Sequence, residues 1–135
     1  MTLIVCVDSN GTILFNKRRV SRDAAVISDI ISNHSADGSP LMMLPYSKSL
    51  FNEYPVEVID SLDEIKEYTD RVLFAESSGL SRLNGLVTTV VLYVWDKVYP
   101  KGESFDLDLS DYSLISETVI TGKSHKEIVR RVYAI

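Results

Sequence analysis

The sequence predicts a single α/β domain in which a mainly parallel central sheet is flanked by helices. Several short apolar runs are continuous rather than alternating, which indicates strands buried on both faces, as in parallel sheets. Segments with apolar residues at helical spacing separate these runs, an order typical of α/β folds. The 135 residues are enough to bury a core and few enough for one domain, so residues 1–135 are assigned to one domain.

The first third of the chain predicts two strands and a helix. Residues 3–7 form a continuous apolar run and predict a buried strand, and residues 12–15 predict a short return strand. Asn10 and Gly11 lie between them and favour a tight turn, because both tolerate positive φ. Ser21 is expected to cap the helix that follows. The apolar face of this helix is made by Ala24, Val26, Ile27, Ile30 and Ile31.

The alternation continues through the rest of the chain. Further strands are predicted at residues 40–43, 56–59, 71–75, 87–96 and 112–120. Short helices or helical turns are predicted at residues 47–52, at 77–84 and after Ser61, where Glu64 completes a capping box. Residues 125–135 fit either a helix face or a final edge strand, and both alternatives stay open.

Composition restricts the partners and the location that we expect. A formal charge of -5 argues against nucleic acid as the main partner, because neutralising phosphates needs a basic surface. Cys6 is the only cysteine and cannot form an internal disulfide, so a reducing cytoplasm is expected. No apolar run approaches the roughly 20 residues of a membrane span, and the first residues lack the basic region of a signal peptide.

Segments at the start, middle and end of the chain resemble the dihydrofolate reductase family in the same order. Residues 3–13, LIVCVDSNGTI, are similar to the opening I-V-A-V-D-x-N-G-x-I of that family. Residues 39–51, SPLMMLPYSKSLF, align without gaps with K-P-V-I-M-G-R-x-T-x-x-S-I. Residues 90–117 resemble the closing L-Y-L-T-E-I, an acidic F-P-x-I-D and W-x-L-V-S. The resemblance implies a short member of the dihydrofolate reductase-like fold, with a C-terminal antiparallel strand pair.

The residues that this family uses to bind NADPH are mostly replaced. A phosphate at a helix N-terminus needs free N–H groups, close backbone approach and a nearby cation. The family's Gly-Arg is Leu44-Pro45 here, its Gly-Gly is Glu76-Ser77, and its pocket Thr is Trp95, whereas Ser47 keeps a hydroxyl in place of Thr. The flavin-pathway reductases that share the fold have Gly-rich phosphate sites that are also missing. We therefore expect no cofactor, with NADPH as the alternative.

The family also places a carboxylate early in its first helix, beneath the pterin. Asp23 is the best match and Asp29 a poorer one, lying more than a turn further on. In a reductase, Asp23 would be the catalytic residue that supplies the proton. The alternative is structural, since an acidic residue in the first turn favours the helix dipole.

A basic cluster precedes this helix. Lys17, Arg18, Arg19 and Arg22 could form an anion site, with hydrogen bonds from Asn16 and Ser21, because arginine contacts phosphate through two N–H groups. A nucleotide, a phosphorylated metabolite or an RNA backbone would fit such a site. The alternative is a solvated loop with local ion pairs of little energetic value.

Two further groups of residues bear on function. Tyr93 and Trp95 share one face of a strand and could stack on a planar ligand or form a dimer contact, although a packed core is the simpler explanation. Two histidines and one cysteine without close spacing exclude the usual zinc sites, so no metal is expected.

These observations lead to three functional hypotheses. The first is a non-reductase protein that binds a small anionic or nucleotide-like ligand, or a protein partner, through Arg18, Arg19 and Arg22 beside Asp23. The second is a divergent NADPH-dependent reductase of a small heterocycle. The third is a structural protein that forms a homodimer through an exposed sheet face centred on Tyr93 and Trp95.

Overall fold

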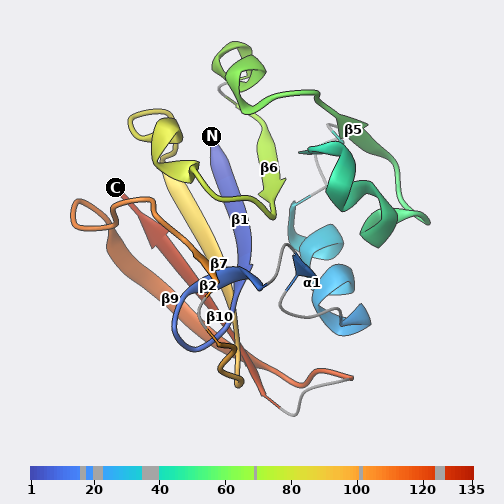
Figure 1. Ribbon diagram of the computed structural model, residues 1–135, viewed down its shortest axis with the longest axis vertical. Coiled ribbons are helices and arrows are strands. Elements are labelled where there is room, and N and C mark those ends of the chain that lie inside the picture. The colour runs from blue at the N-terminus through green and yellow to red at the C-terminus, as the bar shows by residue number, and fades with distance from the viewer. Residues whose placement is uncertain (16–17, 20–22, 35–39, 69, 101, 124–126) are drawn as a thin grey trace.

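The computed structural model describes the chain except for residues 16–17, 20–22, 35–39, 69, 101 and 124–126. The main sheet has seven strands in the order β5-β4-β6-β1-β7-β10-β9 (Figure 1). The strands are β1 (Thr2–Val7), β4 (Leu41–Met43), β5 (Val56–Val58), β6 (Val72–Ala75), β7 (Thr89–Trp95), β9 (Ser113–Ile120) and β10 (Ile128–Ala134). Pairing is parallel from β5 to β7, and β10 is antiparallel to both β7 and β9. The predicted mainly parallel sheet with a C-terminal antiparallel pair is confirmed.

A small second sheet lies at the carboxyl end of β1. Its central strand β2 (Thr12–Phe15) pairs with β3 (Arg18–Arg19) and β8 (Glu103–Ser104). Asp8 organises the turn between β1 and β2, because its fully buried carboxylate accepts hydrogen bonds from the N–H groups of Asn10 at 2.9 Å, Thr12 at 2.8 Å and Tyr99 at 2.9 Å. The predicted tight turn is present, with Gly11 at a φ of 80°.

The helical layers are thinner than predicted. Among the described residues, only α1 (Ala24–His34) is an α-helix, and η1 (Pro45–Phe51), η2 (Leu62–Glu67) and η3 (Leu80–Leu83) are 3-10 helices. The predicted cap Ser21 lies outside the described residues, and Asp23 fills the capping position directly before α1. The capping box at Ser61 and Glu64 is confirmed in both of its hydrogen bonds.

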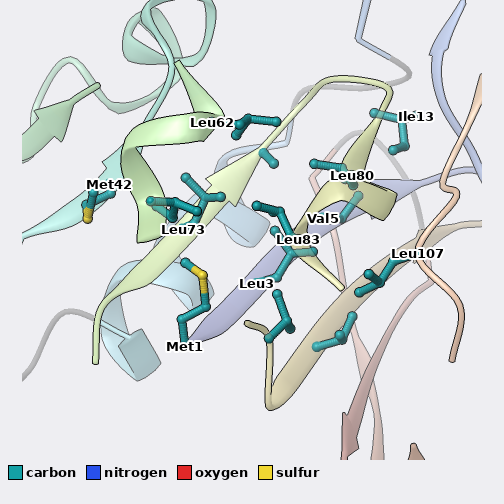
Figure 2. Close-up of a cluster of buried hydrophobic side chains, with 14 of the residues drawn as sticks. Met1, Leu3, Val5, Ile13, Met42, Leu62, Leu73, Leu80, Leu83 and Leu107 are labelled. Carbon is teal, nitrogen blue, oxygen red and sulfur yellow. The ribbon is translucent and has the colours of Figure 1, made fainter. Parts of the chain in front are cut away.

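The central strands β1, β4, β6 and β7 are buried on both faces, as their continuous apolar runs predict. Alternate residues of β1 point to opposite sides, so that Leu3 and Val5 join one core cluster and Ile4 joins the other. The first cluster is closed by η2, η3 and Leu107 (Figure 2). The second contains Val26 and Ile30 of α1. No helix in the described part of the chain is long and apolar enough to cross a membrane.

The aromatic pair of β7 belongs to the second cluster. Tyr93 is 0% and Trp95 1% exposed, because α1 packs on the sheet face to which both side chains point. The hypothesis of an exposed face centred on these two residues is therefore wrong, and the packed-core alternative holds. The alternatives for the last segment are also resolved, since residues 128–134 form a strand between β7 and β9.

Candidate functional site

The carboxyl ends of the parallel strands are where ligands bind in open α/β sheets. Here β4 ends at Met43 and β6 ends at Ala75, and these two strands are neighbours. The residues that follow them, Tyr46, Ser47 and Glu76, therefore lie at the same edge of the sheet. The same edge carries Pro45 and Glu76, where the sequence departs from the reductase pattern.

An ion pair between Arg19 and Glu76 occupies this edge. The guanidinium of Arg19 donates through Nε to Glu76 Oε2 at 2.9 Å and through Nη2 to Oε1 at 3.1 Å. The hydroxyl of Ser47 donates to the same Oε1 at 2.8 Å. The side chains of Arg19 and Glu76 are 17% and 6% exposed, so the pair is largely shielded from solvent. A buried carboxylate is tolerated here because both of its oxygens are satisfied by these donors.

Tyr46 holds Arg19 in place from the other side. Its carbonyl oxygen accepts from Arg19 Nη2 at 3.1 Å, and its hydroxyl accepts from the Arg19 N–H at 3.2 Å. The guanidinium carbon lies 4.7 Å from the centre of the Tyr46 ring, within the range of a cation–π contact. Cys6 lies close enough to be influenced by this group: burial and the Glu76 charge raise the pKa of its thiol, and Arg19 opposes them.

Asp23 joins α1 to a distant segment. Its carboxylate accepts from the N–H of Ala25 at 2.8 Å through Oδ1 and from the N–H of Lys123 at 2.8 Å through Oδ2. Its carbonyl oxygen accepts from the N–H of Ile27 at 3.2 Å. The sequence predicts Asp23 within the first turn of the helix, but the residue lies directly before that turn and is only 3% exposed. The carboxylate caps the helix and fixes the chain at Lys123.

A second charged cluster was missed by the sequence analysis. Oδ2 of Asp29 accepts from the Tyr93 hydroxyl at 2.6 Å and from Arg130 Nη1 at 2.7 Å. Burial is the main cause that raises the pKa of Tyr93, and its hydrogen bond to Asp29 is the second. The hydrogen bond from Arg130 to Asp29 raises the pKa of Arg130. The helical position of Asp29, three residues after buried Val26, is the one sequence signal that could have revealed its contact with the sheet.

The predicted ligand-binding residues are brought together only in part. Arg19 and Ser47 meet at Glu76, whereas Arg18 is exposed and takes part in none of the ion pairs among the described residues. Asn16 and Arg22 lie outside the described residues. Trp95 is buried on the α1 side of the sheet, where it contributes to the core. The ligand-binding roles of these residues remain predictions.

A groove lies beside this edge, between α1 and η1. It has a volume of about 310 Å³, which is near the lower limit for small-molecule sites. It is lined by Ala24, Ile27, Ser49, Leu50, Asn52, Glu53 and Tyr54. Among the described residues that line it, Glu53 is the only charged one, and on this lining the groove suits a ligand that is neutral or positively charged and presents hydrogen-bond donors. Within the described residues, no group of three or more histidine, cysteine or acidic side chains could hold a metal ion.

The edge at β4 and β6 does not fit the phosphates of a dinucleotide. Pro45 has no N–H group to donate at the start of η1, and the N–H of Ser47 already donates to the carbonyl oxygen of Leu44 at 3.1 Å. Glu76 puts a negative charge where the resemblance places the cofactor's phosphates, and the cation beside it, Arg19, is already paired with that carboxylate. The absence of NADPH at this position stays a prediction, and the titration below tests it.

Comparison with known proteins finds a match by structure but none by sequence. No protein-family model matches this chain, and no curated protein matches it. Among solved structures, a dihydrofolate reductase from Enterococcus faecalis, complexed with NADP(H) and RAB-propyl, matches with a TM-score of 0.73. The match covers 98% of this chain and 94% of that chain, at 12% sequence identity. At that identity the likeness concerns the fold alone, and it confirms the fold that the sequence resemblance implies: this chain has the dihydrofolate reductase-like fold.

Proposed function

We propose that this chain is a small-molecule-binding protein built on the dihydrofolate reductase-like fold, and that it is not an NADPH-dependent reductase. The observation that carries the proposal is the Arg19–Glu76 ion pair, with Ser47 donating to the same carboxylate. To bind there, a dinucleotide phosphate would have to displace a shielded carboxylate from its partners. The freed carboxylate would then repel the phosphate, since the two like charges would share one edge of the sheet.

The groove between α1 and η1 is the best supported ligand site. Ile27 and Leu50 offer apolar contact to a flat ligand, whereas Asn52 and Glu53 offer polar groups at the rim. The basic cluster suggested an anionic ligand. Because Arg19 is paired with Glu76, binding of an anion would depend on Arg18 and on residues outside the described part of the chain. We therefore favour a neutral or cationic aromatic ligand in the groove. Cys6 is a free thiol, which is consistent with a protein that acts in the reducing cytoplasm.

A thermal-shift titration with NADPH, benzamide and benzamidine tests this proposal. A compound that binds only the folded state raises the unfolding midpoint in a saturable way. We expect no saturable shift with NADPH and a shift with at least one of the two aromatic probes. Saturable stabilisation by NADPH would overturn the exclusion of the cofactor, and silence of both aromatic probes would remove the support for the groove.

Two matched variants locate the aromatic probe. Ala24 is exposed and lines the groove, so Ala24→Phe should fill the space without disturbing the core. Ser28 is exposed on the same helix and does not line the groove, so Ser28→Phe adds the same side chain elsewhere. The shift should disappear in Ala24→Phe and persist in Ser28→Phe. An equal response of the two variants would place binding outside the groove.

The second candidate is a divergent NADPH-dependent reductase of a small heterocycle. The likeness to an Enterococcus faecalis protein complexed with NADP(H) favours it, as does a carboxylate, Asp23, at the start of α1. Against it stands the use of both Asp23 oxygens as acceptors for backbone N–H groups. The NADPH arm of the titration separates the two candidates, because only the reductase requires the cofactor to bind.

A further inference from the structure

Strand β9 is an open edge that carries exposed apolar side chains. Within the described residues, β10 pairs with one side of β9 and no strand pairs with the other. Leu114 is 50%, Ile115 62% and Val119 60% exposed. An uncovered edge strand offers a row of free N–H and C=O groups to another strand, and apolar side chains on it favour such pairing. In Figure 1, β9 lies on the side of the molecule away from α1, whose residues Ala24 and Ile27 line the groove.

The opposite edge of the sheet is protected. Strand β5 has only three residues, and Pro55 precedes it directly. Its central residue, Glu57, forms an ion pair with Arg71 at 3.3 Å. Short length, proline and charge are the usual means by which proteins block edge pairing. By contrast, β9 has eight residues, no proline and no lysine, which marks it as the edge that is available for association.

The apolar surface continues from the sheet to this edge. Val94 of β7 pairs with Val129 of β10, which in turn pairs with Val119. Further along the same face, Tyr133 pairs with Leu114. Pairing skips Ile115, so the strand has a bulge that brings Leu114 to the same face as Val119. The apolar row therefore runs outward and ends, uncovered, at Leu114 and Val119.

We propose that β9 pairs in antiparallel fashion with β9 of a second copy of this chain, around a two-fold axis perpendicular to the sheet. The sequence of the strand, S-L-I-S-E-T-V-I, has apolar residues near both ends and polar residues in the middle. Antiparallel alignment end to end brings Leu114 of each copy opposite Val119 of the other. A two-fold axis of this kind keeps both residues on one face, so the same contact forms twice.

The charges of the strand also favour a second copy. Its single charged residue, Glu117, is paired at 2.8 Å with Arg131 of its own chain. The edge thus presents no uncompensated charge that would require an oppositely charged partner, and two copies can approach without an unpaired carboxylate between them. The contact is limited to one strand of eight residues and a few side chains, which is small for a stable interface. We therefore expect a dimer that forms and dissociates with protein concentration.

Analytical ultracentrifugation over a concentration series tests the proposal. The mass of the native protein should rise from that of one chain to that of two. Val119→Lys and Leu114→Lys should remain monomeric, because a buried lysine opposes pairing. Val98→Lys is the matched control, since Val98 is also 60% exposed but lies outside β9, and it should dimerise like the native protein.

Several outcomes would overturn the proposal. The proposal fails if the native protein stays monomeric at all concentrations, or if both lysine variants of β9 still dimerise. It also fails if the mass of the native protein rises beyond that of two chains. Amide hydrogen exchange in the native protein gives a second measurement that needs no variant. Exchange of the β9 amides should slow as concentration rises, and exchange that is independent of concentration contradicts the interface. Because β9 is remote from the groove, this test and the ligand titration succeed or fail independently.

Discussion

At the scale of single residues, the Arg19–Glu76 ion pair is the largely shielded charge pair at the carboxyl ends of β4 and β6. A largely buried ion pair costs desolvation, so its two members depend strongly on each other. We expect Glu76→Gln to lower the free energy of unfolding by about 3 kcal/mol, because it leaves the Arg19 charge shielded without a counter-charge. The single variant Arg19→Met completes the cycle. The double variant Arg19→Met/Glu76→Gln should lose much less free energy of unfolding than the two single variants together. Urea denaturation of the native protein and the three variants measures this coupling.

The surface ion pair of Arg131 and Glu117 provides the control for that cycle. Its N–O distance is 2.8 Å, against 2.9 Å for Arg19 and Glu76, but its side chains are 39% and 50% exposed. Exposed pairs contribute less than about 1 kcal/mol. Equal coupling energies in the two cycles would show that burial does not distinguish the pairs, which would contradict the argument for a shielded cluster at the sheet edge.

The residues of the site also mark where sequence-based prediction stopped. A carboxylate at position 76 could be read from the sequence as unfavourable for a phosphate, which stays a prediction, but its partner Arg19 is 57 positions away and could not be assigned. Strand alternation correctly put Tyr93 and Trp95 on one face. It could not show that α1 covers that face, because the alternation of a strand carries no information about which side receives a helix.

At the scale of elements, Asp23 connects the start of α1 to the segment between β9 and β10. The Asp23 carboxylate accepts from two backbone N–H groups, those of Ala25 and Lys123. In Asp23→Asn only one side-chain oxygen remains, so the NH₂ group of the amide must face one of these two N–H groups. One backbone donor then loses its acceptor, so we expect a loss of about 1–2 kcal/mol in the free energy of unfolding. Chemical denaturation measures the loss.

Asp63→Asn is the appropriate comparison for that change. Asp63 is exposed in the first turn of η2, and the same substitution there should change stability by no more than about 0.5 kcal/mol. If Asp23→Asn were equally mild, the two hydrogen bonds to Asp23 would not be what holds α1 against the neighbouring segment.

The elements themselves were largely predictable. Continuous apolar runs located β1, β4, β6 and β7, because burial on both faces leaves few polar positions in them. The capping box at Ser61 located the start of η2 to the residue. The final segment remained ambiguous because β10 lies between two strands and has intermediate exposure along most of its length, so its pattern follows neither period clearly.

At the scale of the whole molecule, stability should depend on pH through His34. Burial lowers the pKa of His34 from its ordinary value of 6.5, with Asp29 acting in the opposite direction and Arg130 in the same one. The unfolded chain therefore takes up the proton first, and stability falls as the pH decreases below about 6.5. His34→Gln should flatten this part of the profile. Urea midpoints at a series of pH values test the expectation, which fails if the native protein and the variant show the same slope.

The whole molecule also shows how far fold and chemistry can separate. The chain shares its fold with a dihydrofolate reductase over 98% of its length at 12% identity. The strands that define the fold are retained because any apolar residues of suitable size satisfy them. The phosphate site of the family has more specific requirements, and Pro45 and Glu76 stand where the resemblance places the residues that meet them. Function therefore has to be argued from the site rather than from the architecture.

Trp95 gives the molecule a built-in optical reporter. It is the only tryptophan of the chain and is 1% exposed in the core beneath α1. Its emission should shift to longer wavelength when this one place becomes hydrated, so the denaturation experiments above need no added label. Far-UV circular dichroism reports on the backbone as a whole. A difference between the two transitions would reveal that the α1 side of the sheet opens before the rest of the protein.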